Sequence, residues 1–227
     1  MMRVLIRTVI ALAAICGSAP AWAQGQVYDP VPPRGSAYVR LVNALEGEVT
    51  ARPDFLPQQR LGTAPAQRAM AYTVVENVAT RQLHVEFQEG QRRGQATFRA
   101  EAGSFVTLLL HRTADGIGAT AITDTADFNR ARARLAFYNA IPDCPAATLG
   151  LQPSGPVIFE GVAAFATRTR SVNPVVAQVG ASCGSRVAAP FSLEGIEAGG
   201  MYSIWLIGGG TSVTAFLTRD TTARYRP

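Results

Sequence analysis

The sequence contains no lysine, so all 21 of its lysine-plus-arginine residues are arginines. Schiff-base lysines, lysine general bases and the phosphate-binding lysine of nucleotide-binding loops are therefore excluded. Histidine is scarce as well: only His84 and His111 are present to transfer protons near neutral pH. No apolar run reaches the roughly 18 uncharged residues that a membrane-spanning helix needs. These absences leave few positions at which enzymatic chemistry could be built.

The overall composition is that of a globular protein. Of the 227 residues, 48% are hydrophobic and 16% are charged, which separates the chain from disordered and fibrous proteins. Single cores usually belong to domains of about 100–150 residues. This length therefore allows one large domain or two small ones, and internal evidence has to decide between them.

The first 23 residues have the features of a signal peptide. Arginines flank the start, a short apolar run follows, and Ala21-Trp22-Ala23 gives the small-x-small pattern that signal peptidase recognises. We expect cleavage after Ala23 and export of the mature protein. Removal of this segment leaves 19 arginines against 16 acidic residues, a net charge of about +3. Because the arginines are spread along the chain, no basic stripe indicates a nucleic-acid partner.

Cleavage also removes Cys16 and leaves two cysteines in an oxidising compartment, Cys144 and Cys183. We expect them to form a disulfide. Closing a loop of about 40 residues stabilises a folded protein by about 4 kcal/mol in the chain-entropy model. A metal site is disfavoured because two thiols without nearby histidines do not provide a ligand set.

The chain repeats itself once. A shift of 96 residues places Asn43 and Ala44 on Asn139 and Ala140, and the same shift places the Glu-Ala-Gly triplet at 101–103 on the triplet at 197–199. Separated landmarks that share one offset indicate a duplication. We therefore predict four segments: a signal peptide at 1–23, a proline-rich arm at 24–36, and two related domains at 37–128 and 129–227.

The local patterns are those of strands. Residues 81–88 alternate apolar and polar side chains, as expected for a strand with one buried and one solvated face. Further strands are predicted at 38–43, 72–76, 95–99, 104–111, 118–123, 135–139, 147–151, 157–160, 162–167, 186–193, 201–207 and 212–219. The segments between them are too short for crossover helices. The predicted fold is all-β, with two tandem small antiparallel β-sandwich domains.

A family resemblance begins at residues 28–43, YDPVPPRGSAYVRLVN. This run, just after a signal peptide, resembles the opening of the AlgF family of periplasmic alginate O-acetylation proteins. The likeness extends over the mature chain in length, export and the plan of two β-domains, but it is specific only in the opening. It implies a non-catalytic role beside membrane-bound and periplasmic acetyltransferases, in the acetylation of alginate or a related polymer such as cellulose.

The opening also has a physical interpretation of its own. Its prolines favour extended backbone and predict a stiff arm that leads into the first strand. The arm either packs along the first domain and shields a strand edge, or docks on a partner. The candidate partner-binding residues are Tyr28, Asp29, Pro30, Pro32, Pro33 and Arg34.

Catalytic motifs are weak. Residues 180–184 form a Gly-x-Ser-x-Gly match around Ser182, but a nucleophile elbow requires a helix directly after the serine, and 186–193 has a strand pattern. Both histidines also precede Ser182, against the usual chain order of that motif. We interpret the match as a turn that carries the disulfide, and His84 and His111 as surface or strand-end residues.

Glycan binding is the second functional class. The one tryptophan of the mature chain, Trp205, lies in an apolar strand and is predicted to be buried rather than to stack on a sugar. Paired arginines can bind carboxylates of acidic sugars through charge-assisted hydrogen bonds. The candidate glycan-binding residues are Arg92, Arg93, Arg168 and Arg170.

The sequence therefore predicts a periplasmic, non-enzymatic adaptor that binds acetyltransferases of an exopolysaccharide machine, with no cofactor and no metal. The alternatives are a polysaccharide-binding module and, more distantly, an acetyl-esterase or transferase with a dispersed triad built from residues such as Ser182 and His84.

Overall fold

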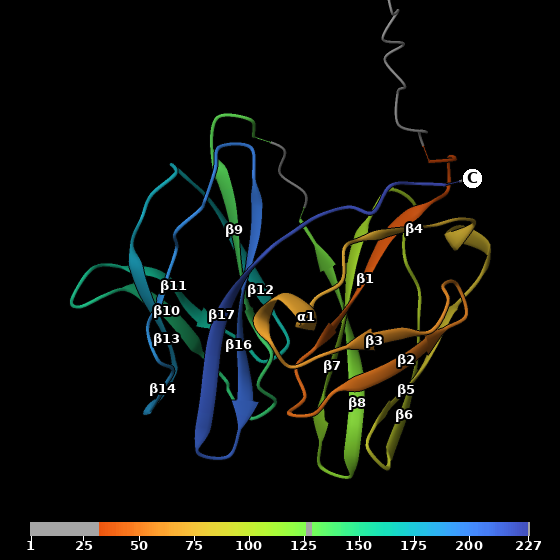
Figure 1. Cartoon of the computed structure of the whole chain (residues 1–227), viewed down its shortest axis with the longest axis horizontal. Coiled ribbons are helices and arrows are strands. Elements are labelled where there is room, and N and C mark those ends of the chain that lie inside the picture. Colours follow the sequence, from red (N-terminus) through yellow and green to blue (C-terminus); the bar gives the residue numbers. More distant parts are fainter. Residues whose placement is uncertain (1–31, 126–128, 227) are drawn as a thin grey trace, which may run out of the picture.

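The computed structural model describes residues 32–125 and 129–226 (Figure 1). The predicted signal peptide and the first part of the arm, including Tyr28, Asp29 and Pro30, lie outside the described residues. Within the described part, almost all regular structure is β-strand, which confirms the all-β prediction.

The first half of the chain forms eight strands and two very short helical turns. These elements are β1 (Ala37–Asn43), β2 (Val49–Pro53), β3 (Gln59–Leu61), α1 (Pro65–Arg68), β4 (Thr73–Val75), the 3-10 turn η1 (Val78–Thr80), β5 (Leu83–Glu89), β6 (Arg92–Phe98), β7 (Phe105–Thr113) and β8 (Gly116–Asp124).

The second half forms nine strands. These are β9 (Ala133–Asn139), β10 (Ala147–Leu151), β11 (Val157–Val162), β12 (Thr167–Val172), β13 (Gln178–Cys183), β14 (Arg186–Val187), β15 (Phe191–Ser192), β16 (Met201–Gly209) and β17 (Ser212–Arg219).

Each half is a sandwich of two sheets. The first half pairs an inner sheet, β4-β1-β7-β8, with an outer sheet, β3-β2-β5-β6. The second half pairs an inner sheet, β12-β9-β16-β17, with an outer sheet, β11-β10-β13-β14, in which β15 also pairs with β13. Figure 1 shows the two inner sheets side by side at the centre of the molecule, with the outer sheets on the flanks.

The order of strands in the two inner sheets follows the sequence repeat. Tyr38 pairs with Phe105 in the first half, and Arg134 pairs with Met201 at positions shifted by 96 residues. These pairs, β1 with β7 and β9 with β16, are parallel, whereas the other pairs are antiparallel. The duplication is therefore present in the strand register. The residue limits of the two domains stay a prediction, and residues 126–128 at their seam are not described.

Burial explains why some strands have almost no polar residues. The inward faces of each half form its own core, with Leu41 and Val85 in the first half and Phe137 and Ala181 in the second. A further apolar cluster joins the halves and contains Val42, Ala44, Leu109, Ile122, Ala136, Tyr138, Ala140, Trp205, Ile207 and Phe216. The inner strands are thus covered on both faces, and all seven residues of β9 are buried.

The predicted disulfide is present. Cys144 and Cys183 are bonded, with Cα atoms 5.8 Å apart. Cys183 ends β13 opposite Ala147, so the bond ties the start of β10 to its neighbouring strand. A disulfide fits the oxidising compartment outside the cytosol that the signal peptide predicts. No helix within 32–125 or 129–226 is long and apolar enough to cross a membrane.

Several predicted strands are corrected by the structure. Residues 162–167, predicted as one strand, contain the end of β11, a turn with Phe165 at φ 57°, and only the first residue of β12. Residues 186–193 break into the two-residue strands β14 and β15. Strands β2, β3 and β13 were not expected. They are short or rich in small residues, so their periodicity gives little signal.

Candidate functional site

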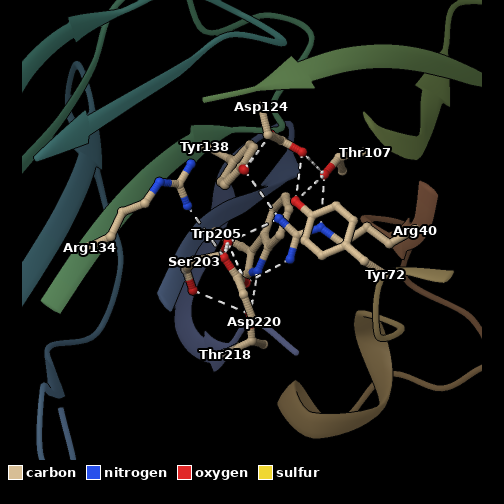
Figure 2. Close-up of polar contacts among 10 residues, drawn as sticks. All are labelled: Arg40, Tyr72, Thr107, Asp124, Arg134, Tyr138, Ser203, Trp205, Thr218 and Asp220. Atoms are coloured by element: carbon tan, nitrogen blue, oxygen red, sulfur yellow. Dashed lines mark hydrogen bonds and ion pairs between the residues drawn. The ribbon is translucent and has the colours of Figure 1, made fainter. Parts of the chain in front are cut away.

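A polar cluster of charged and hydroxyl side chains lies buried where the two inner sheets meet. Figure 2 shows side chains of both halves converging on Arg40, which lies on β1 and is 1% exposed. Its guanidinium donates hydrogen bonds to Thr107 (2.8 Å), Asp220 (2.6 Å), Tyr138 (3.1 Å) and Ser203 (3.0 Å). Arg40 therefore binds partners from both halves of the chain.

The repeat places a carboxylate and a hydroxyl on each side of Arg40. The Thr107 hydroxyl donates to Asp124 at 2.6 Å, and at positions shifted by 96 residues the Ser203 hydroxyl donates to Asp220 at 2.7 Å. Thr107 and Ser203 also accept hydrogen bonds from Arg40, so each hydroxyl links the guanidinium to one carboxylate. This relay satisfies polar groups that would otherwise be costly to bury.

Aromatic rings enclose the cluster and complete it. The hydroxyls of Tyr72 and Tyr138 donate to Asp124 at 2.7 and 2.5 Å. The guanidinium carbon of Arg40 lies 4.3 Å from the ring centre of Tyr72 and 5.1 Å from that of Trp205, within cation–π range. Trp205 stacks on Tyr138 with ring centres 4.1 Å apart. The predicted burial of Trp205 is confirmed, since it is 0% exposed.

The electrostatics of this cluster hold its protons in place. Burial raises the pKa of Tyr72 and Tyr138, although the positive charge of Arg40 opposes the rise. Burial lowers the pKa of Arg40, but the neighbouring tyrosines and carboxylates outweigh that effect and the net pKa is raised. The phenols therefore stay protonated as donors and the guanidinium stays charged.

The junction cluster offers no room for a substrate. The cavity beside Asp124, Arg134 and Asp220 has a volume of about 10 Å³, which is close to the space needed by one water molecule. A reactive site must admit its substrate, so we assign this cluster to the cohesion of the two halves.

An open groove lies instead on the outer sheet of the first half. It has a volume of about 560 Å³ and is lined by outward side chains of β2, β5 and β6, together with Phe87 and Gly94 from the inward-facing positions. Strand pairing places Arg52, Glu86 and Gln95 in one row across the sheet, and Thr50, Gln88 and Arg93 in the next. The lining is thus polar, with guanidinium, amide, carboxylate and hydroxyl groups on a rigid sheet. Such groups can bind the hydroxyls and charged substituents of an extended ligand.

The four arginines predicted to bind glycan are not brought together. Arg93 lines the groove, whereas the adjacent Arg92 lies in a separate hollow, 3.5 Å from Glu89. Neighbouring residues of a strand point to opposite faces, so these two cannot act as a pair. Arg168 and Arg170 are exposed on β12, at the edge of the other half's inner sheet.

Part of the predicted partner-binding arm can be located. Pro33 accepts a hydrogen bond from Ser36 at 3.3 Å, and Gly35 accepts one from Val78 at 3.1 Å. The end of the arm is thereby attached to the first sandwich beside η1. Pro33 and Arg34 are exposed and Pro32 is half-buried.

The residues weighed for catalysis have structural surroundings. Ser182 lies inside β13 rather than in a turn, and the chain continues into β14 without a helix. The His111 ring bonds the Arg112 carbonyl at 2.7 Å and the Thr120 hydroxyl at 2.9 Å. His84 bonds Thr97 at 3.1 Å. Within the described ranges, no group of three histidine, cysteine or acidic residues could hold a metal ion.

Sequence reasoning did not single out the junction cluster, although two signals were present. Arg40 is the one charged residue in the apolar run 37–42, which is unusual for a strand that is otherwise buried. Asp124 and Asp220 recur at the repeat distance of 96 residues. Neither signal reveals that the two aspartates face each other across a shared arginine, because that requires the packing of the halves.

Comparisons with known proteins add little. No protein-family model matches the chain, and no curated protein matches it. Among solved structures, it is similar to CBMbc, a family 26 carbohydrate-binding module of Amy13K from Eubacterium rectale in complex with maltoheptaose. The identity is 8%, the match covers 85% of this chain and 98% of that chain, and the TM-score is 0.27. A score this low does not establish a common fold, and we base no functional argument on it.

Proposed function

We propose that the protein is an exported, non-catalytic accessory protein of exopolysaccharide production that contacts the polymer through the groove of its first half. The observation that carries this proposal is the groove itself, a polar surface of about 560 Å³ formed by three adjacent strands. A sheet fixes the spacing of its outward side chains, so the ligand groups are held in position before the polymer binds.

The direct test is binding of polysaccharide by the mature protein. Affinity electrophoresis in gels containing alginate, xylan or soluble cellulose derivatives measures retardation without labelling. We expect at least one of these polymers to retard the protein, and the variant Gln88→Ala/Gln95→Ala to lose most of that retardation.

The second half supplies a matched control for this experiment. Thr148 and Ser182 are paired neighbours on β10 and β13, in the outer sheet of the other sandwich. The variant Thr148→Ala/Ser182→Ala should be retarded like the wild type. If no polymer retards the wild-type protein, or if both double variants behave alike, the groove is not a polysaccharide site.

A finer proposal is that the protein supports O-acetylation by binding acetyltransferase components. It is supported by the family-like opening and by the exposed end of the arm at Pro33 and Arg34. Pull-down from periplasmic extract should recover acetyltransferases with the mature protein and much less with a variant that lacks residues 24–31. Recovery of polymer alone by both proteins would contradict the adaptor role.

Enzymatic activity is the competing proposal, and an esterase assay tests it. A chromogenic acetyl ester should not be hydrolysed above the background rate by the mature protein. Hydrolysis that disappears with Ser182→Ala, His84→Ala or His111→Ala would replace the adaptor proposal with an esterase or transferase.

A further inference from the structure

The groove contains two guanidinium groups without a carboxylate partner. Strands β2, β3, β5 and β6 carry four arginines, of which Arg60 pairs with Glu48 at 2.9 Å and Arg92 with Glu89 at 3.5 Å. Across residues 32–125 and 129–226, no salt bridge involves Arg52 or Arg93, and both residues are exposed. Arg52 is steadied by one hydrogen bond, from its Nε to the Gln58 amide oxygen at 3.0 Å. The two unpaired arginines are the ones that line the groove.

Strand register sets the distance between these two charges. Arg52 pairs with Glu86, and Arg93 pairs with Gln88, which lies two residues further along β5. Two strand spacings in one direction and two residue rises in the other separate their Cα atoms by about 12 Å. A small anion cannot contact both guanidiniums at once. The spacing suits an extended polymer that carries several negative groups.

The groups between the two arginines suit the neutral part of such a polymer. Gln88 lies between them on the central strand β5, and Gln95 lies two residues from Arg93 on the same face of β6; each amide can donate to or accept from a sugar hydroxyl. Glu86 is the only acidic residue of the lining, so the groove carries a net charge of +1. A carboxylate of the ligand in the middle of the groove would face Glu86, whereas carboxylates at the two diagonally opposite corners would face Arg52 and Arg93.

We propose that the groove selects polysaccharides that carry carboxylates, with Arg52 and Arg93 each binding one carboxylate and Gln88 and Gln95 binding hydroxyls of the adjacent sugars. This inference rests on the proposed function, because it names the class of polymer that the same groove takes. Guanidinium binds carboxylate in a planar, two-pronged geometry that lysine cannot reproduce.

The test compares one polymer with and without its charge. Polygalacturonate and its fully methyl-esterified form have the same backbone, and only the former presents carboxylates. We expect isothermal titration at low salt to show binding of the free acid and at least tenfold weaker binding of the ester. Arg52→Gln and Arg93→Gln should each weaken binding of the acid by about tenfold, the scale of one lost charge-assisted hydrogen-bonded contact.

The neighbouring arginine provides a matched control. Arg92→Gln removes the same charge one residue away from Arg93, on the opposite face of β6, and should leave the affinity within about twofold of the wild type. Arg52→Lys should recover only part of the loss, because it restores the charge without the planar geometry. Circular dichroism and thermal unfolding of each variant separate loss of binding from loss of fold.

The possible outcomes separate this inference from the proposed function. Equal binding of acid and ester, lost only in Gln88→Ala/Gln95→Ala, would overturn the selection of carboxylates and leave a neutral-polysaccharide groove. A second contrary result would be that dextran sulfate binds as tightly as polygalacturonate and that Arg92→Gln weakens binding as much as Arg93→Gln. This result would show nonspecific attraction between charges and would also overturn the selection of carboxylates. Failure of every polymer to bind would overturn the groove function itself.

Discussion

At the scale of single residues, Arg40 links the two halves through hydrogen bonds to their side chains. It donates to four side chains drawn from both halves, and Asp220 lies 2.6 Å from its guanidinium. A buried ion pair adds little net stability relative to a well-packed apolar pair, but removal of one partner leaves a buried charge uncompensated. The contribution of Arg40 to stability is therefore best measured by replacing it.

We predict that Arg40→Met lowers the free energy of unfolding by about 3–5 kcal/mol, because the buried Asp220 then keeps only Arg134, at 3.6 Å, as a counter-charge and the buried Asp124 loses the positive charge of Arg40. Denaturant unfolding measures the change. The control is Arg60→Met, which breaks an ion pair to Glu48 with side-chain exposures of 76% and 54%. That variant should change stability by less than about 1 kcal/mol. Similar losses in the two variants would contradict the role of Arg40 at the junction.

His111 makes stability depend on pH. Its ring lies against Phe165 of the other half, with ring centres 4.0 Å apart and planes tilted by 32°. Burial lowers the pKa of His111, although the bond to the Arg112 carbonyl opposes this. The unfolded chain therefore takes up a proton at higher pH than the folded one. The contribution of neutral His111 is complete above the unfolded pKa of about 6.5, and it is lost as pH falls from there toward the folded pKa.

We accordingly predict that urea unfolding shows a decrease in stability between pH 7.5 and pH 5, and that His111→Gln makes this decrease smaller. The charged group adjacent to the ring is Arg112, which itself pairs with Glu89 at 3.0 Å. An unchanged pH dependence in His111→Gln would assign the effect to other groups.

At the scale of elements, each inner sheet begins with a strand that ends in an asparagine. The Asn139 amide donates to the carbonyls of Cys144 and Val162, both at 2.9 Å, and its oxygen accepts from the Ile141 amide. Asn43 makes the corresponding bonds to Gly47, Gly62 and Leu45. One side chain thus fixes the crossover from an inner sheet to an outer sheet in both halves.

We predict that Asn139→Ala costs about 1–3 kcal/mol, because buried carbonyl and amide groups lose their partner. The matched control is Asn129→Ala, whose oxygen accepts a single exposed bond from the Ala131 amide and which should cost less than about 0.5 kcal/mol. Thermal unfolding of the two variants gives the comparison. Equal effects would mean that the strand-end bonds are dispensable.

The elements also show how far sequence patterns reach. The alternation at 81–88 correctly predicted β5, with Leu83 and Val85 inside. Strand β13 was hidden because Gly180, Ala181 and Ser182 at its centre are small residues that give little contrast between the two faces. The parallel pairing within the inner sheets follows from long connections, and no local pattern reports it.

Local sequence patterns could not predict the candidate site either. The groove is formed by residues of β2, β5 and β6 that are brought into register only by strand pairing. Arg93 could be named from the sequence as part of an arginine pair, but its true neighbours are Gln88 and, diagonally across the sheet, Arg52. Which side chains share a face could be predicted within one strand, whereas which strands share a sheet could not.

At the scale of the whole molecule, the C-terminal tail returns from the second half to the first. The backbone amide of Tyr72 donates to the Thr221 carbonyl at 2.8 Å, and the backbone carbonyl of Tyr72 accepts from the Ala223 amide at 2.7 Å. The Tyr225 hydroxyl donates to Glu76 at 2.6 Å. Figure 1 shows this segment, in blue, crossing to the start of the first sandwich. The tail thus provides a second contact between the two halves, in addition to the buried junction.

We predict that deletion of residues 221–227, which keeps Asp220, lowers stability by about 1–3 kcal/mol through the two lost backbone bonds. Hydrogen exchange measured by mass spectrometry should become faster around Tyr72 and β4. Exchange in β13, in the far outer sheet, should stay as in the wild type. Faster exchange confined to the second half would contradict the strapping role of the tail.

The partnership of Arg40 with Asp220 has a consequence for biosynthesis, because 180 residues separate them. Arg40 is synthesised long before Asp220, so the first sandwich initially has a solvated guanidinium on the face that later packs against the second half. The N-terminal half therefore reaches its final form only after β17 has been made. A chain truncated before residue 220 should consequently lose stability in the first sandwich as well as in the second.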